Sequence, residues 1–108
     1  MNAQLEKYNV VSFSGGRTSA YMIHRIQTMV SQGLIKNVKY VYMDTGAEHP
    51  KTYDFIRQVV KHFGIDLVCL RSVMTTEVGV GATWRQISID EICDDYGPWK
   101  DMMKCYST

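Results

Sequence analysis

The sequence predicts an α/β fold built on a parallel sheet, and two patterns support this prediction. Apolar runs rich in β-branched and aromatic residues occur at residues 8–13, 38–43 and 65–70, as expected of buried strands. Stretches with helical apolar spacing separate these runs, at residues 18–32 and 50–63. The connections are short, which favours parallel strands joined by right-handed crossovers.

Both predicted helices carry an apolar stripe and end at a glycine. The stripe of the first helix consists of Met22, Ile23, Ile26, Met29 and Val30. The stripe of the second consists of Tyr53, Ile56, Val59, Val60 and Phe63. Gly33 and Gly64 follow the two stripes as natural helix ends, and Pro50 suits the first position of the second helix.

The last third of the chain has a less regular pattern. Residues 78–82 are typical of a flexible loop, and residues 88–91 match a capping box, which predicts a short helix to about residue 95. The dipeptide Gly97-Pro98 predicts a break in the chain's regular structure. We find no signal here that completes a domain.

The length of 108 residues suits a single domain that spans residues 1–108. Residues 71–108 are its less regular part, and three parallel strands alone would leave an exposed sheet edge. We therefore expect the domain to continue in a longer parent chain, or a helix or another subunit to cover that edge. Association with a second copy or with a protein partner follows from the same argument.

The composition excludes several classes of protein. Hydrophobic residues make up 45% of the chain and charged residues 21%, the usual balance of a soluble globular domain. The formal net charge of +1 gives no bulk attraction to nucleic acid or to a membrane surface. Apolar stretches fall well short of the roughly 20 residues of a membrane span. The N-terminus lacks the features of a signal peptide, which predicts a cytoplasmic protein.

A glycine-rich turn lies between the first predicted strand and the first predicted helix. Such a turn aims backbone N–H groups and the positive end of the helix dipole at one point. Gly15 and Gly16 leave that point open, Arg17 adds positive charge, and hydroxyl donors come from Ser12, Ser14, Thr18 and Ser19. These features predict an anion or phosphate site. The alternative is a turn that merely permits close packing of strand and helix.

Two motifs resemble a known family. Residues 14–19 are similar to the SGGxDS pyrophosphate loop of the PP-loop family, the adenine nucleotide α-hydrolase-like ATP pyrophosphatases. Residues 44–52, which begin Asp-Thr-Gly and end Pro-Lys-Thr, resemble the corresponding stretch of phosphoadenosine phosphosulfate (PAPS) reductase-like proteins. Small phage and bacterial members have an opening similar to residues 12–22. The resemblance covers residues 8–70 and implies a Rossmann-like, three-layer parallel sheet of the PP-loop (HUP) type, here shortened.

The resemblance also implies roles for the matching residues. The phosphates of the nucleotide would be bound by Ser14, Gly15, Gly16, Arg17, Thr18 and Ser19. The rest of the nucleotide would contact Ser12, Phe13, Asp44, Thr45 and Gly46, with Asp44 near the ribose or the adenine edge. Arg71 ends the third predicted strand at the same edge and suits a bidentate contact with phosphate or sulfate, although a solvated surface charge is the alternative.

The implied function is binding of an adenine nucleotide, ATP or PAPS, by an oxidoreductase of the PAPS reductase type or by an ATP pyrophosphatase. Two departures from the family pattern bear on activity. Thr18 is neutral where pyrophosphatases carry an Asp, which makes Mg²⁺ a less favoured cofactor. The reductases' ECGxH-type cysteine segment is absent from this sequence. A non-catalytic nucleotide-binding or protein-interaction module is therefore the alternative to an enzyme.

The remaining candidate residues do not form a second site. His24, His49 and His62 lack the close ligand spacing of zinc sites, and we predict no metal site. Cys69 and Cys93 lie in apolar or helical patterns that predict packing roles, and the sequence has no CxxC pair.

Overall fold

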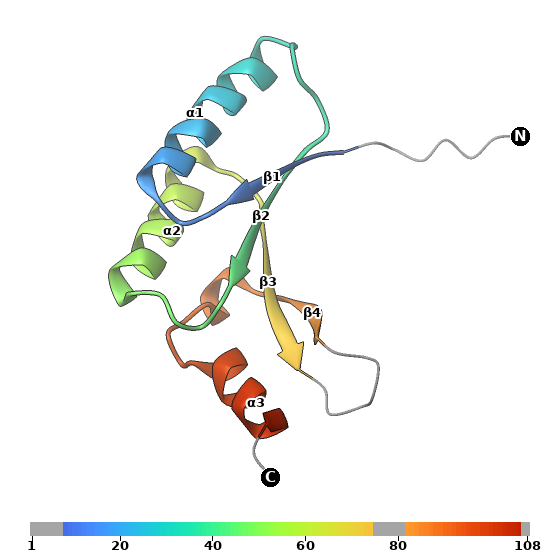
Figure 1. Cartoon of the computed structure of the whole chain (residues 1–108). Coiled ribbons are helices and arrows are strands. Elements are labelled where there is room, and N and C mark those ends of the chain that lie inside the picture. The colour runs from blue at the N-terminus through green and yellow to red at the C-terminus, as the bar shows by residue number, and fades with distance from the viewer. Residues whose placement is uncertain (1–7, 75–81, 107–108) are drawn as a thin grey trace, which may run out of the picture.

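The computed structural model describes residues 8–74 and 82–106, which form a four-stranded sheet with helices (Figure 1). In chain order the elements are β1 (Asn9–Phe13), α1 (Arg17–Ser31), β2 (Val38–Asp44), α2 (Pro50–Phe63), β3 (Leu67–Met74), β4 (Ala82–Ile87), the 3₁₀ helix η1 (Ile89–Glu91) and α3 (Gly97–Tyr106). The strand order is β1-β2-β3-β4, with parallel β1–β2 and β2–β3 pairs and an antiparallel β3–β4 pair. The predicted α/β class with a parallel sheet is confirmed.

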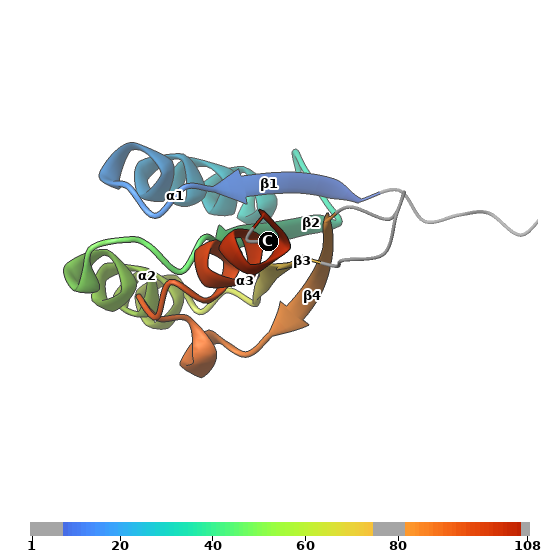
Figure 2. The ribbon, with the colours of Figure 1, turned by 60° about the horizontal axis from the view of Figure 1, so that its bottom comes forward.

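Helices α1 and α2 lie on the same face of the sheet, and the core is between them and the strands (Figures 1 and 2). Alternate strand residues point into this core, among them Phe13, Tyr42 and Cys69, while Ile23 and Ile56 enter it from the helices. The fully buried core residues supply most of the apolar burial that stabilises the fold. The predicted apolar stripe of α2 packs on the core along its whole length. The stripe predicted for α1 is only partly correct, because Ile23 and Ile26 pack on the core whereas Met22 and Val30 are exposed.

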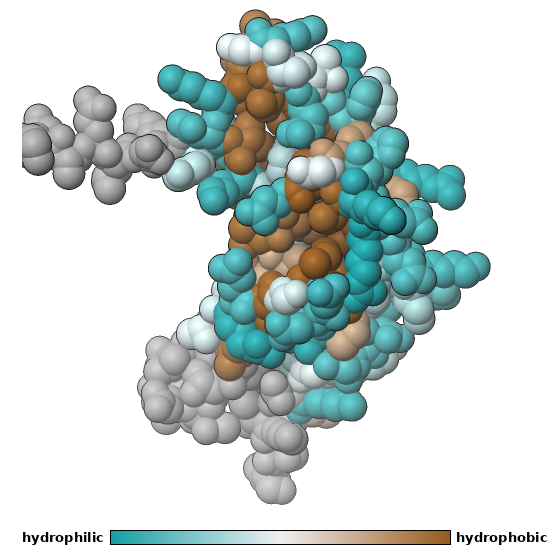
Figure 3. Space-filling view, turned by 180° about the vertical axis from the view of Figure 1, so that it is seen from behind, coloured by the Kyte–Doolittle hydropathy of each residue, from teal (hydrophilic) through white to brown (hydrophobic). Residues whose placement is uncertain are grey.

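The opposite face of the sheet is not covered by a helix layer within the described residues. On the strands, Val10, Met43 and Trp84 are 67%, 49% and 50% exposed. Seen from behind, hydrophobic side chains form a band down the middle of the molecule (Figure 3). The part of the chain that the structure describes therefore supplies two of the three layers that the family resemblance implies.

The C-terminal third departs from the sequence prediction in three places. Strand β3 continues to Met74, and the whole of β4 pairs with residues 69–74 of β3. Gly97-Pro98 opens α3 instead of breaking the structure, because proline is tolerated in the first turn of a helix. The capping box at Ser88 is present but starts only a 3₁₀ turn. Of the predicted loop at residues 78–82, Ala82 opens β4 and the rest lies outside the described residues.

The two motif loops lie at the same edge of the sheet, as predicted. Strand β1 ends beside β2 with Phe13 opposite Tyr42, and β2 ends beside β3 with Asp44 opposite Arg71. Strand order follows chain order, so it does not reverse within the described residues. Helix α3 lies at the same carboxyl edge (Figure 2). Among the helices described, none has the length and apolar character needed to cross a membrane.

Candidate functional site

The glycine turn joins β1 directly to α1. Gly15 has a positive φ of 86°, and Gly16 is the N-cap with φ −97° and ψ 167°. A Cβ on Gly15 would lie 3.1 Å from Thr52 Cγ2 and 3.2 Å from Ile56 Cδ1, so α2 packs closely against the turn. Only glycine combines this φ with this close approach. Gly15 thus permits close packing of the turn against α2, and its part in phosphate binding stays a prediction.

Gly16 and the residues after it have a different environment. A Cβ on Gly16 would meet only Ser14 Oγ, at 3.6 Å, so the outer side of the turn is open. No side chain caps α1, and its first turn contains no acidic residue. The first backbone N–H groups of a helix have no partner within the helix, so those of Arg17, Thr18 and Ser19 point outward. This arrangement can bind an anion through main-chain donors and the helix dipole.

Two hydroxyl groups flank these amides. Ser14 Oγ and Ser19 Oγ lie 2.6 Å apart and share a hydrogen bond. Gly16 N donates weakly to Ser14 Oγ, at 3.4 Å. Both serines can turn their O–H groups toward a bound anion, since a hydroxyl rotates about its C–O bond. The predicted phosphate-binding residues 14–19 thus lie together at the start of α1, with Gly15 buried and the other five at least partly exposed.

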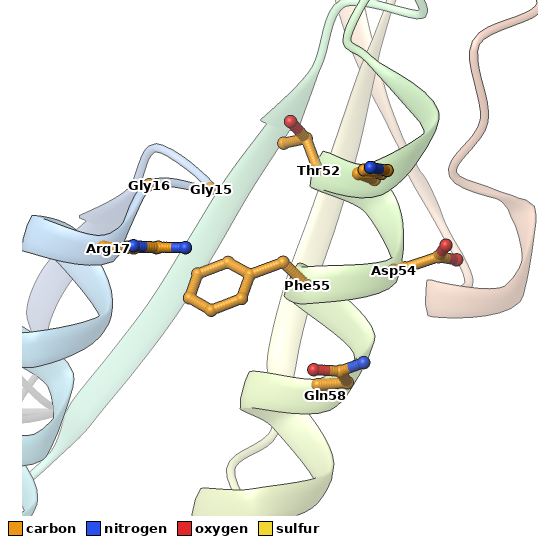
Figure 4. Close-up of a pocket in the computed structure, with 8 residues that line it drawn as sticks. Gly15, Gly16, Arg17, Thr52, Asp54, Phe55 and Gln58 are labelled. Atoms are coloured by element: carbon orange, nitrogen blue, oxygen red, sulfur yellow. The ribbon is translucent and has the colours of Figure 1, made fainter.

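A cleft of about 520 Å³ adjoins the turn and extends along α2. Its walls are formed by Gly15, Gly16, Arg17, Lys51, Thr52, Asp54, Phe55 and Gln58. Figure 4 shows the Arg17 side chain reaching from α1 toward α2, and the Phe55 ring extending from α2 toward the turn. The sequence analysis did not include Lys51, Phe55 or Gln58. Their spacing along the second predicted helix, at i, i+4 and i+7, was the signal that they share one face.

The second motif loop is built around a buried carboxylate. Asp44 is 0% exposed and uses both oxygens inside the protein. Oδ1 accepts hydrogen bonds from Gly46 N at 2.9 Å and from the Tyr53 hydroxyl at 2.8 Å. Oδ2 is 2.9 Å from Arg71 Nη2, an ion pair. Burial is the main cause that raises the pKa of Tyr53, and the hydrogen bond to Asp44 adds to it.

Arg71 links this loop to the segment before α3. Its Nη1 donates to Asp95 Oδ2 at 2.9 Å, and its Nη2 also donates to the Cys93 carbonyl at 3.2 Å. Burial alone would lower the pKa of Arg71, but hydrogen bonds to Asp95 and Asp44 outweigh it and raise the pKa. The hydrogen bond from Arg71 is also the main cause of the lowered pKa of Asp95.

The segment from Cys93 to Pro98 covers the Asp-Thr-Gly loop. Tyr96 N donates to the Gly46 carbonyl at 2.7 Å, and a Cβ on Gly46 would lie 2.9 Å from Pro98 Cδ. Asp95 lies at the end of the short helix that the capping box at residues 88–91 predicted. Its pairing with Arg71 spans 24 residues and had no sequence signal.

The predicted nucleotide contacts therefore divide into two groups. One group is at the surface: Ser12, Ser14, Gly16, Arg17, Thr18 and Thr45 are exposed and Ser19 is half-buried, whereas Gly15 and Gly46 are buried. The side chains of Phe13, Asp44 and Arg71 are buried, and Asp44 and Arg71 form an ion pair with each other. A nucleotide contact for these three stays a prediction. The exposed part of the predicted site is centred on the glycine turn and the cleft beside it.

Comparison with known proteins assigns the sequence to a family. The model of the phosphoadenosine phosphosulfate reductase domain matches residues 8–105, which include every described element except the last residue of α3. The chain belongs to the phosphoadenosine phosphosulfate reductase domain family.

Individual relatives agree with the family assignment. A nin region protein of Escherichia phage lambda, described as uncharacterized, is 46% identical over 103 residues, which are 93% of this chain and 35% of that protein. A phosphoadenosine 5'-phosphosulfate reductase of Thiocapsa roseopersicina is 28% identical over 85 residues, 76% of this chain and 34% of the reductase. This member of the reductase domain family thus spans about a third of either relative's length. No solved structure matches the chain significantly.

Proposed function

We propose that this chain is an adenine-nucleotide-binding PP-loop domain that binds PAPS or ATP through the glycine turn at residues 14–19. The observation that carries the proposal is the uncapped start of α1, where Gly16 leaves the first-turn amides open beside Arg17. Family membership supports a nucleotide ligand, because the chain matches a reductase domain over residues 8–105. The neutral Thr18 favours main-chain and hydroxyl contacts over a Mg²⁺-bridged one.

Isothermal titration calorimetry tests this proposal with ATP, PAPS and AMP, each with and without Mg²⁺. We expect a measurable heat of binding for ATP or PAPS that disappears in Gly16→Trp, because an indole would fill the open side of the turn. Gly33→Trp is the matched control. A Cβ on Gly33 would also meet open space, and Gly33 follows the far end of α1. Absence of binding to all three nucleotides would contradict the proposal.

The second candidate function is a non-catalytic module that binds the nucleotide without turning it over. The observation that favours it is the closed state of the Asp-Thr-Gly loop, whose Asp44 is already neutralised by Arg71. Pyrophosphate release from ATP and sulfite release from PAPS with a thiol reductant distinguish the two functions. Binding without either product supports the module, and turnover that Gly16→Trp abolishes supports an enzyme.

A further inference from the structure

A groove of about 370 Å³ lies between α1 and α2, which run side by side (Figures 1 and 2). Its lining residues are Ala20, Phe55, Gln58, Val59, His62 and Phe63. Ala20 of α1 and Val59 of α2 are buried, whereas Phe55 and Phe63 are half-buried and also pack against the core. The two polar lining residues are exposed. The groove is therefore an apolar depression with its polar groups at the margin.

Aromatic rings from both helices shape the end of the groove that is far from the glycine turn. The Phe63 ring lies 5.9 Å from the His24 ring of α1 and 4.8 Å from the His62 ring, which it meets edge-on. Tyr21 is 63% exposed and extends this row along α1, 6.2 Å from His24. Rings at such separations attract one another, so the groove keeps its shape without an occupant. A preformed groove lowers the entropic cost of binding.

The apolar lining has the periodicity of a helix. Phe55, Val59 and Phe63 are spaced i, i+4 and i+8, so they follow α2 for about two turns, or about 12 Å. Apolar side chains that recur every three or four residues on an amphipathic helix match such a stripe. An extended peptide would gain no main-chain pairing here, because both walls are helices whose backbone groups are already hydrogen-bonded. The groove thus suits the apolar face of another helix.

The exposed surface of the two helices is basic. Helix α1 contains no acidic residue, and α2 contains only Asp54, which lies 4.0 Å from Arg57. Arg25 and Lys61 are exposed, and neither forms an ion pair with any residue that the structure describes. An unbalanced positive surface attracts a negatively charged partner and disfavours a basic one. The complementary occupant is a helix with acidic residues beside its apolar stripe.

The described elements of the chain itself do not combine these two properties. Helix α3 exposes Trp99 and Met103, but it carries two lysines and one aspartate, so its charge does not complement a basic surface. Residues 90–95 are acidic, but they begin in η1 and continue as a loop, and the apolar Ile92 among them is buried. A second copy therefore offers an apolar stripe or acidic charge, and not both on one helix. These observations favour a different protein.

We propose that the α1–α2 groove is a docking site for an acidic amphipathic helix of a partner protein. The apolar residues of that helix would pack against Ala20 and the apolar stripe of α2. Its carboxylates would interact with the exposed cations, Arg25 and Lys61 among them. This inference goes beyond the proposed function, because it concerns a protein partner and does not require that the chain bind a nucleotide.

Calorimetry and proton–nitrogen correlation spectra of the full chain test the proposal with a panel of designed helical peptides. Each peptide is about 18 residues long, or about five helical turns, with Leu, Met or Phe in its apolar stripe and Glu beside it. A twin of each peptide has Lys at every Glu position. We expect micromolar binding of at least one Glu peptide, with amide shift changes concentrated at residues 20–24 and 55–63. Its Lys twin should bind at least about tenfold more weakly.

Two double variants test whether the charge beside the groove selects the peptide. Arg25→Glu combined with Lys61→Glu should weaken binding of the Glu peptide about tenfold, because attraction is replaced by repulsion at two exposed positions. Lys36→Glu combined with Lys100→Glu is the matched control, since it changes the net charge equally at exposed positions outside α1 and α2. The control should change the affinity less than about twofold.

Several results would overturn the inference. If no peptide binds, the groove does not accept a helix. If the Glu and Lys peptides bind equally, or both double variants weaken binding equally, the basic surface does not select an acidic partner. Self-association in sedimentation equilibrium, with shift changes in the groove, would assign the groove to a second copy. Binding of a thymidine oligonucleotide there, without binding of any Glu peptide, would assign it to nucleic acid.

Discussion

Gly15 shows how a single residue without a side chain sets the geometry of the turn. Its φ of 86° is unfavourable for any other residue, and α2 atoms lie just over 3 Å from the position of a Cβ. Gly33 has a similar φ of 76° but nothing within 4 Å of that position. A comparison of substitutions at the two glycines therefore distinguishes the cost of backbone strain from the cost of steric contact.

We expect Gly15→Ala to lower the free energy of unfolding by about 2–4 kcal/mol, the sum of left-handed strain and overpacking. Gly33→Ala should lower it by only about 1–2 kcal/mol, since strain is its single cost. Urea unfolding followed by circular dichroism measures both values. Equal losses in the two variants would show that α2 does not press on the turn.

The carboxylates on either side of Arg71 differ in burial, which predicts different contributions to stability. Asp44 is wholly buried, whereas the Asp95 side chain is 47% exposed. We expect Asp44→Asn to cost about 3–5 kcal/mol of unfolding free energy, because it removes the buried partner of Arg71 and leaves this cation only the half-exposed Asp95. Asp95→Asn should cost less than about 1 kcal/mol, since solvent screens this pair. The same urea titration decides between this ranking and its reverse.

The lowered pKa of Asp95 also predicts a dependence of stability on pH. Because the folded state binds the proton of this group less tightly than the unfolded chain, its contribution is complete above the ordinary Asp pKa of about 3.9. The contribution is lost as the pH falls through the lower folded value. Unfolding free energies measured from pH 6 to 2.5 should fall less steeply in Asp95→Asn than in the wild type. Parallel curves would contradict the assigned role of the Arg71 contact.

At the scale of elements, Arg57 connects α2 to the turn that follows β4. Its Nη2 donates to the Ile92 carbonyl at 2.6 Å and its Nε to the Ile89 carbonyl at 3.3 Å. Arg57→Met keeps most of the apolar stem but removes both donors. We expect a loss of about 1.5–3 kcal/mol and faster amide hydrogen exchange at residues 89–92. Arg25→Met, at an exposed position of α1, should change neither quantity.

The elements of residues 8–70 could be predicted because each one carries its own local signal. Apolar periodicity located β1, α1, β2, α2 and the start of β3, and glycine and proline marked their ends. Strand β4 gave no such signal, because Thr83, Trp84, Arg85 and Gln86 are all exposed and only Ile87 is buried. Its place in the sheet comes from pairing with β3, a tertiary contact.

At the scale of the whole molecule, the sheet brings one half of the predicted site to the surface and buries the other. The glycine turn could be located from sequence because its backbone conformation is one that glycine makes possible. The ion pairs of Arg71 with Asp44 and Asp95 could not be predicted, since they join residues that lie 24 or more positions apart in the chain. The part of this chain that matches covers about a third of the length of each of the two relatives.

The central claim is that the main-chain amides at the start of α1 bind a phosphate group of an adenine nucleotide. Proton–nitrogen correlation spectra recorded during a titration with ATP or PAPS observe these amides directly. We predict that the largest shift changes occur at Gly16, Arg17, Thr18 and Ser19. Saturating shifts elsewhere, with these four amides unchanged, would contradict the account.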